Sequence, residues 1–222
     1  FIMSNKKGYC CAINANIIVE AFRDKSYLNI IRNAEFNTCD GINVQHLYNL
    51  TKKDRIKVYP GPNLFLEIIN KPGNTHFFLG GQEHVLKGLV RELNKIGLNI
   101  PSTHFYSPPF LPVDQFNYQD IGQLINKVNP DFIWIGLGAP KQEIFMSNLL
   151  PYINRGLMLG VGAAFNFYSG LSEFKRAPDF MVNLHLEWLF RAFQEPKRII
   201  KRQLKNLLYL PLIIFNELKT KK

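Results

Sequence analysis

The chain has 222 residues, of which 46% are hydrophobic and 20% charged, and its formal net charge at pH 7 is +10. This length and composition exclude general disorder and argue against two full domains; they fit one α/β domain with a small appendage. The positive charge indicates an anionic partner, for which nucleic acid, a phosphorylated substrate and an acidic membrane surface are all candidates.

Strand-like and helix-like segments alternate through the first half of the chain. In order, the pattern predicts a strand at 9–13, helices at 17–22 and 26–33, strands at 35–39 and 55–59, a helix at 64–69, a strand at 76–79 and a helix at 85–93. The strand at 35–39 runs into Asp40-Gly41, a pair that favours a tight turn. The strand at 76–79 runs into Gly80-Gly81.

The most informative segment begins with a short apolar run at 131–135, which predicts a buried strand. Gly136 and Gly138 follow, and Pro140 stands at the predicted start of a helix. Unpaired N–H groups at a helix start, with Lys141 beside them, suit a phosphate or diphosphate. The alternative is an ordinary turn between a strand and a helix, because short glycine motifs often occur without a ligand.

A helix at 121–128 precedes the strand at 131–135. An apolar strand at 157–162 follows the helix that is predicted to start at Pro140. Strands separated by helices predict a Rossmann-like α/β fold, with a mostly parallel sheet and helices on both faces. Ligands of such sheets bind at the carboxyl ends of the strands. We therefore expect one rim to carry Asp40, Gly80, Gly81, residues 136–142 and residues 162–166.

The chain changes character after residue 171, so we divide it into an α/β core at 1–171 and a helical appendage at 172–222. One face of a helix beginning at Pro196 is basic and the opposite face is apolar; the basic residues are Lys197, Arg198, Lys201, Arg202 and Lys205. Such a helix suits the surface of an anionic bilayer, and the alternative is a helix packed on the core with solvated charges. The longest apolar run, 207–215, is too short to cross a bilayer.

The cysteines indicate the redox state of the compartment in which the protein works. Cys10, Cys11 and Cys39 lack the spacing of a zinc site, which favours a reducing compartment and no zinc. No signal-peptide pattern is visible at the start, so we expect a cytosolic protein. Whether further residues precede the strand at 9–13 is left open.

Six patches follow one another between residues 10 and 198. They are Asp40-Gly41-Ile42, Phe78-Leu79-Gly80-Gly81, the stretch 129–143, Gly160-Val161-Gly162-Ala163-Ala164-Phe165, Arg176-Ala177-Pro178, and Glu187-Trp188-Leu189-Phe190-Arg191 with Glu195-Pro196. In these patches the chain resembles the WecG/TagA/CpsF glycosyltransferase family, glycosyltransferase family 26. One glycine motif alone would be a weak signal, whereas the ordered set is specific.

The resemblance implies an inverting transferase that moves N-acetylmannosamine or its uronic acid from UDP to a polyprenyl-diphosphate-linked GlcNAc. It also implies a peripheral position on the inner face of the cell membrane, in the synthesis of teichoic acid, enterobacterial common antigen or capsule. The family's proposed general base matches Asp40, and its site glutamine matches Gln142. Its threonine–asparagine pair falls on Ala12 and Asn14, and Asn166 stands where an aspartate is expected. These departures leave donor choice and acceptor positioning open.

The residue types fit this chemistry. Asp40 can accept the proton of an attacking hydroxyl, although an aspartate before glycine is also a common turn residue, and Gln142 can bind a sugar hydroxyl or a phosphate oxygen. Because no Asp-x-Asp occurs, we expect no metal or other cofactor, and we expect arginines of the tail to stabilise the diphosphate. The substrate-binding candidates are Asn14, Gly80, Gly81, Gly136, Gly138, Pro140, Lys141, Gly162, Asn166, Arg176, Arg191 and Arg198, with Arg202 as a further arginine.

Three other functions are candidates, of which the second fails in detail. The first is a transferase for a UDP-hexose or another UDP-sugar in capsule or exopolysaccharide assembly. The second is an NAD-dependent dehydrogenase, but Lys141 replaces the third glycine of its motif and no acidic residue follows at the required distance. The third is a non-catalytic module that binds nucleic acid or a membrane surface, which would leave Asp40 and Gln142 without a role. For the transferase we expect no nucleic-acid partner, and a homo-oligomer is left open.

Overall fold

The computed structural model describes residues 6–52, 54–173, 176–184 and 186–219. Its strands are β1 (Lys7–Ile13), β2 (Phe36–Cys39), β3 (His76–Gly80), β4 (Phe105–Tyr106), β5 (Phe132–Gly136) and β6 (Gly156–Gly160). Its helices are α1 (Ala15–Arg23), α2 (Lys25–Arg32), α3 (Ile42–Thr51), α4 (Gly61–Ile69), α5 (Glu83–Lys95), α6 (Tyr118–Val128), α7 (Lys141–Leu149), α8 (Ala164–Tyr168), α9 (Asp179–Asn183), α10 (Glu187–Gln194) and α11 (Pro196–Lys219). The remaining turns include short 3-10 segments.

The six strands form one sheet in the order β2-β1-β6-β5-β3-β4, and every pairing is parallel. The predicted α/β fold is therefore confirmed. Along β5, Phe132 and Trp134 point to one face of the sheet, and Ile133 and Ile135 point to the other, because side chains alternate along a strand.

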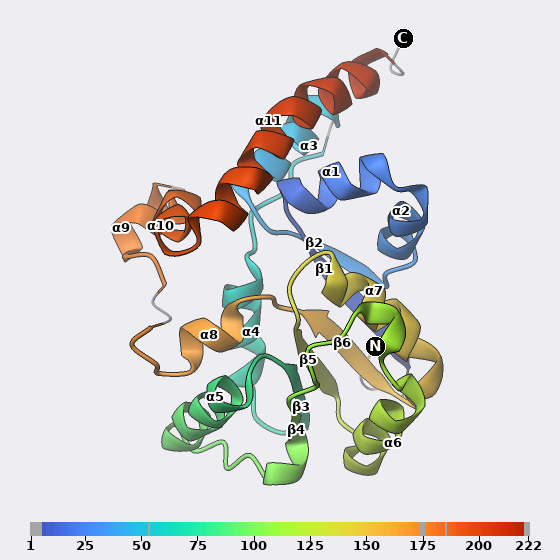
Figure 1. The fold of residues 1–222 in the computed structure, drawn as a ribbon, viewed down its shortest axis with the longest axis vertical. Helices are drawn as coiled ribbons and strands as arrows, with labels where there is room; N and C mark the ends of the chain where they lie inside the picture. Colours follow the sequence, from blue (N-terminus) through green and yellow to red (C-terminus); the bar gives the residue numbers. More distant parts are fainter. Residues whose placement is uncertain (1–5, 53, 174–175, 185, 220–222) are drawn as a thin grey trace.

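Helices cover both faces of the sheet. In Figure 1, α4, α5 and α8 lie on one side and α6 and α7 on the other. The first side is built around aromatic contacts of Phe65, whose ring centroid lies 4.9 Å from that of Trp134. On the other side Phe145 of α7 packs edge-on against Phe116 at 5.1 Å. Burial on both faces explains the nearly continuous apolar composition of β3, β5 and β6.

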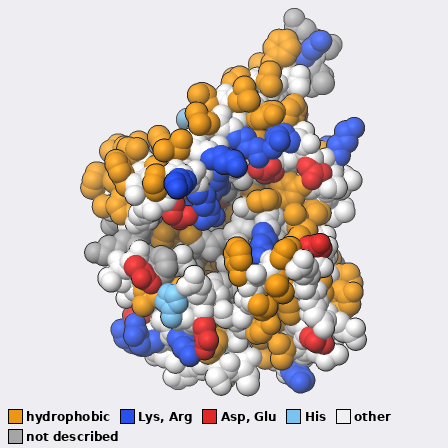
Figure 2. Space-filling model, viewed as in Figure 1, with side chains coloured by type: hydrophobic (Ala, Val, Ile, Leu, Met, Phe, Trp, Pro, Cys, Tyr) orange, Lys and Arg blue, Asp and Glu red, His pale blue; other side chains and the backbone are white. Residues whose placement is uncertain are grey.

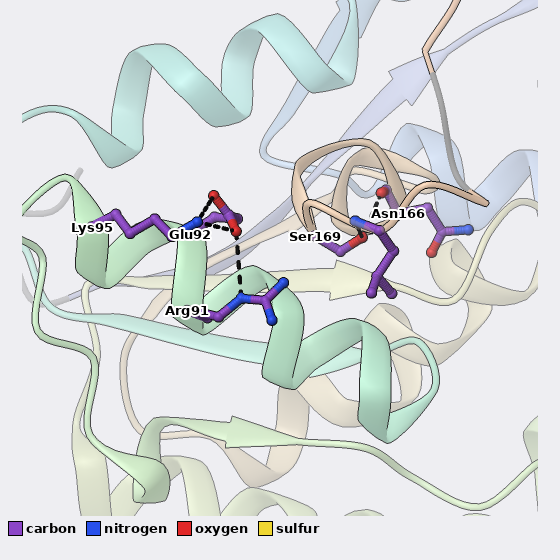
Figure 3. Close-up of polar contacts among 6 residues, drawn as sticks. Arg91, Glu92, Lys95, Asn166 and Ser169 are labelled. Carbon is purple, nitrogen blue, oxygen red and sulfur yellow. Dashed lines mark hydrogen bonds and ion pairs between the residues drawn. The ribbon is translucent and has the colours of Figure 1, made fainter.

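The end of α8 lies close against α5, as Figure 3 shows. The buried Ser169 donates from its hydroxyl to the carbonyl of Asn166 at 2.8 Å, and a Cβ on Gly88 of α5 would stand only 2.5 Å from the Ser169 carbonyl. On the same helix, Glu92 pairs with Lys95 and Arg91. The side chain of Asn166 points away from this contact.

Prediction and structure differ locally. The segment 55–59, predicted as a strand, has no ladder; one backbone bond, from the Tyr59 N–H to the Cys39 carbonyl at 2.7 Å, ties it to the end of β2. Helix α3 and the two-residue strand β4 were not predicted. Helix α3 lacks a side-chain N-cap and has weak apolar periodicity, so its sequence carries little helical signal.

Helix α11 closes the fold at the opposite end from α6. It lies beside α1 and α3 (Figure 1), and Lys205 pairs with Glu20 of α1. Ile199 and Ile213 of α11 are buried. The division of the chain at residue 171 stays a prediction, but the appendage packs on the core. Among the helices of the described residues, none combines the length and the apolarity that crossing a membrane would need.

Candidate active site

A cleft of about 620 Å³ opens at the carboxyl ends of β1, β2, β5 and β6 and is roofed by α10 and α11. Of the predicted site residues, ten line it: Asn14, Asp40, Gly81, Gly136, Gly138, Gln142, Gly162, Asn166, Arg191 and Arg198, and Arg202 does so too. In Figure 2 Lys and Arg side chains gather along the arm formed by α10 and α11, above the hollow. The predicted rim and the tail therefore enclose one space.

Asp40 is held at the end of β2 by three hydrogen bonds. Its backbone N–H donates to the Ile13 carbonyl at 2.8 Å, so that the turn after β2 stays beside the end of β1. Its carboxylate accepts from the side-chain amide of Asn14 at 3.4 Å and from the Gly61 N–H at 3.3 Å. Asn14 is also the N-cap of α1, where its carboxamide oxygen accepts from the Ile17 N–H. Asn14 therefore orients the Asp40 carboxylate.

The environment of Asp40 favours its protonated form. The pKa of this carboxyl is raised from 3.8 to about 6: burial is the largest cause and the nearby Glu187 adds to it, whereas Asn14, Gly61 and Arg191 lower it. A carboxyl group whose pKa lies near neutrality can take a proton and release it again in one catalytic cycle. The electrostatics of this position suit a general base.

Gln142 connects the two glycine turns that follow β5 and β6. Its side-chain oxygen accepts from the Gly138 N–H at 3.2 Å and from the Gly162 N–H at 3.1 Å, and the residue is only 4% exposed. We had expected this side chain to bind a sugar hydroxyl or a phosphate oxygen. In the structure it lines the cleft, but its oxygen already serves two backbone donors and so fixes the shape of the cleft floor.

A buried carboxyl group fixes Gln142 in turn. The Gln142 amide donates to Glu143 at 2.8 Å, and the hydroxyl of Tyr27 from α2 donates to the other Glu143 oxygen at 3.0 Å. Glu143 is fully buried, and burial raises the pKa of its carboxyl. The sequence indicated only that Glu143 supports the start of a helix, because its partner Tyr27 lies more than a hundred residues away.

Three arginines of the tail supply positive charge to the cleft. A guanidinium nitrogen of Arg198 lies 3.5 Å from where a Cβ on Gly138 would stand. Glu195 pairs with Arg198 at 2.7 Å and with Arg191 at 3.8 Å. Arg202 has no ion-pair partner within 4 Å in the described part of the chain, and burial beside Arg198 and Arg191 lowers its pKa. The cleft is lined by three arginines and by three carboxyl groups, those of Asp40, Glu187 and Glu195, so its formal charges balance. The Arg202 guanidinium, which forms no ion pair with these carboxyl groups within 4 Å, suits an anionic ligand.

The basic face predicted for the tail helix is divided between two surroundings. Arg198 and Arg202 line the cleft, and Lys205 contacts Glu20, while Lys197 and Lys201 are exposed. The opposite apolar face is largely exposed, with Leu204 at 63% and Leu207 at 74%. The tail is thus neither a simple solvated helix nor a detached one.

The glycines of the rim serve different purposes. Gly138 has a φ of +74° and faces the cleft, as predicted for close approach of a ligand. At Gly136 a Cβ would stand 2.5 Å from the Phe165 ring, so this glycine makes room for core packing. At Gly80 a Cβ would stand 2.8 Å from the backbone of Gly136, and Gly80 does not line the cleft.

Three further candidates lie outside the cleft. Lys141 turns to the proline-rich loop, where its ammonium donates to the Leu111 carbonyl and lies 4.9 Å from the centre of the Phe116 ring, and it does not line the cleft. Arg176 donates to Asn63 at 3.1 Å and pairs with Glu187 at 3.9 Å. Pro140 is the N-cap of α7 and not its first residue. Lys141, Arg176 and Pro140 therefore contact residues around the cleft and do not line it.

The sequence missed four residues that the structure places at the cleft: Gly61, Glu187, Glu195 and Asn206. Asn206 could have been found, because it stands seven residues after Ile199 and seven before Ile213, on the buried stripe of α11. No comparable signal marks Gly61, which reaches Asp40 through its backbone. Among the described residues, no three His, Cys, Asp or Glu side chains are grouped as metal ligands.

Comparison with known proteins identifies the family. The model of the Glycosyl transferase WecG/TagA/CpsF family matches residues 1–222. An N-acetylglucosaminyldiphosphoundecaprenol N-acetyl-beta-D-mannosaminyltransferase of Bacillus subtilis (strain 168) is 30% identical over 219 residues, covering 95% of this chain and 80% of that protein. The protein of the same name from Bacillus spizizenii is 28% identical over 203 residues, covering 89% and 76%. The chain belongs to the WecG/TagA/CpsF family of glycosyl transferases.

Proposed function

We propose that this protein is an inverting transferase that moves an N-acetylmannosamine-type sugar from UDP to the GlcNAc of a polyprenyl-diphosphate-linked acceptor. The observation that carries the proposal is Asp40, a carboxyl group with a pKa near 6, in the same cleft as Arg191, Arg198 and Arg202. The names of the two relatives describe such an acceptor and a beta-linked product. UDP-sugars of this type are alpha-linked, so a beta product requires inversion.

Each group then has one task. The Asp40 carboxylate takes the proton from the acceptor hydroxyl while the hydroxyl oxygen bonds to C1 of the sugar, and the bond from C1 to the UDP oxygen breaks. Arg198, beside the Gly138 turn, stabilises the charge that develops on the diphosphate. Gln142 keeps the Gly138 and Gly162 turns at the spacing that receives the donor. No step in this scheme requires a metal.

The test is a transfer assay with the purified protein, a panel of UDP-sugars and a soluble short-chain lipid-diphosphate GlcNAc acceptor. We expect UDP release and a disaccharide product with UDP-ManNAc or its uronic acid, and loss of most turnover in Asp40→Asn. Preference for a UDP-hexose would favour the alternative transferase. Binding of NAD without binding of UDP would instead support a dehydrogenase, and absence of transfer with every sugar would refute the proposal.

We further propose that the tail rests on the anionic inner face of the cell membrane. Lys197 and Lys201 are exposed on α11, and exposed apolar side chains stand nearby, including Phe193 and Phe215. Lys197→Glu with Lys201→Glu should weaken binding to phosphatidylglycerol vesicles, most strongly at low salt. Lys95→Glu with Lys127→Glu carries the same charge change on α5 and α6 and serves as the control. Equal binding by both variants would refute the tail as the membrane contact.

A further inference from the structure

A second cavity, of about 370 Å³, adjoins the cleft in the notch between α10, α11 and the start of α3. Its lining is mostly apolar: Trp188, Ala192, Ile199, Ile200, Leu204, Leu207 and Leu210, with Asn43, Gln203 and Asn206. We call this cavity the apolar groove. Five residues line both spaces, namely Asn43, Trp188, Ile199, Gln203 and Asn206, so the cleft and the groove meet there.

The chemistry changes sharply across this boundary. Arg202 lines the cleft but not the groove, and Leu207 lines the groove but not the cleft, although the two residues are only five positions apart on α11. A molecule that occupies both spaces would therefore need an anionic part and an apolar part joined directly. A volume of this size lies within the range of small-ligand pockets.

Asn206 stands where the two spaces meet. It is only 7% exposed, and its carboxamide oxygen has no hydrogen-bond partner among the residues that the structure describes. A buried polar atom without a partner is unfavourable, so a ligand that completes its bonding is expected. A carboxamide can present its NH2 group or its oxygen by rotating about its last bond, and the NH2 group suits a phosphate oxygen.

We propose that the apolar groove holds the first isoprene units of the acceptor, while the acceptor's diphosphate lies beside Arg202 and Asn206. This inference rests on the proposed function and adds the route of the lipid chain to it. The charge of Arg202 fits the diphosphate, the leucines fit the hydrocarbon, and the acceptor in the relatives' names joins both. Arg198 is left for the donor diphosphate at the Gly138 turn.

The first experiment compares two soluble acceptors without vesicles: GlcNAc diphosphate on three isoprene units and on one. We expect the wild-type kcat/KM to favour the three-unit acceptor by about tenfold or more, since added apolar contact strengthens binding. Leu207→Gln should remove most of this preference. Leu208→Gln, which is 63% exposed on the same helix but outside the groove, is the matched control and should retain the preference.

A second variant fills the groove. Ala192→Trp should raise KM for the three-unit acceptor much more than for the one-unit acceptor. No preference in the wild type, equal loss in Leu207→Gln and Leu208→Gln, or no effect of Ala192→Trp would each overturn the groove. If Leu207→Gln loses activity only when vesicles are present, the leucine contacts the membrane surface and the proposal is wrong.

A binding measurement separates the groove from the proposed reaction. Trp188 lines both spaces and is 47% exposed, so its fluorescence should change when farnesyl diphosphate binds. Isopentenyl diphosphate, with one unit, should bind more weakly, and Leu207→Gln should lose the difference. If farnesyl diphosphate binds in this way but no sugar is transferred, the groove stands and the proposed function fails. If transfer occurs without this chain-length dependence, the opposite holds.

Discussion

Replacing Asp40 by Asn should make the protein more stable at pH 8 while removing most of its activity. The folded state raises the pKa of this carboxyl from 3.8 to about 6, and a difference of about 2 in pKa corresponds to roughly 3 kcal/mol. Because the folded state holds the proton more tightly, this contribution to stability is complete below pH 3.8 and is lost as the pH rises through 6.

Asparagine has the shape of the protonated acid and no charge, but its NH2 group cannot accept, and both Asn14 and Gly61 donate to Asp40. The lost hydrogen bond should cost about 1 kcal/mol at every pH. Between pH 4 and pH 8 the difference in free energy of unfolding should shift in favour of the variant by about 2 to 3 kcal/mol, because the variant avoids the cost of a buried charge.

The assay is urea unfolding of both proteins between pH 4 and 8, followed by tryptophan fluorescence, to which the buried Trp134 contributes. Asp24→Asn is the control: Asp24 is an exposed cap of α2 whose carboxylate accepts hydrogen bonds from Ser26 and Tyr27, which lower its pKa. The stability contributed by a carboxyl group with a lowered pKa is nearly complete above the unfolded value of 3.8, so Asp24→Asn and the wild type should keep a nearly constant difference from pH 4 to 8. If Asp40→Asn and the wild type keep a constant difference from pH 4 to 8, the fold does not raise the pKa of Asp40 as we describe.

Four further predictions follow from the site. With wild-type protein, kcat/KM should rise with pH and level off above about 6, since the base must be ionised; a flat profile across this range would count against Asp40. Gln142→Ala should lower the free energy of unfolding by about 2 to 4 kcal/mol in urea titrations, because it leaves two backbone donors and the Glu143 carboxyl without their partner, and an unchanged midpoint would exclude that role. Arg198→Ala should weaken UDP binding about tenfold in calorimetry, whereas Lys141→Ala should leave it nearly unchanged, and the reverse order would show that the lysine reaches the phosphate. Turnover in EDTA should equal turnover in magnesium, and any requirement for a divalent ion would contradict the assignment of diphosphate binding to arginine.

The sequence predicted the parts of the site that depend on local pattern. Asp40 and Gly138 follow predicted strands, and the carboxyl ends of parallel strands meet at one edge, so their proximity could be expected. The position of Lys141 could not, because the carbonyl that captures it belongs to a loop thirty residues earlier in the chain. The bonds of Gln142 depend in the same way on the Gly162 turn, twenty residues later.

The contacts that were predicted and those that were not differ in how far apart their residues lie in the sequence. Periodicity reports burial within one element, and it identified the faces of the sheet and the two-sided character of α11. It does not report which distant backbone group will satisfy a buried side chain. For this reason Glu143, whose phenolic partner comes from α2, could be assigned to a helix start but not to the support of the cleft floor.

The firm attachment of α11 bears on the length of the acceptor. Helix α11 is tied to the core through Glu20 and through the buried Ile199 and Ile213, so it does not swing independently of the strands that carry Asp40. From Arg202 to Leu207 the helix rises only about 7.5 Å. If the apolar groove holds the isoprene units as proposed, the fold sets the distance between the lipid and Asp40. The protein should then discriminate between acceptors by the number of sugars on their diphosphate.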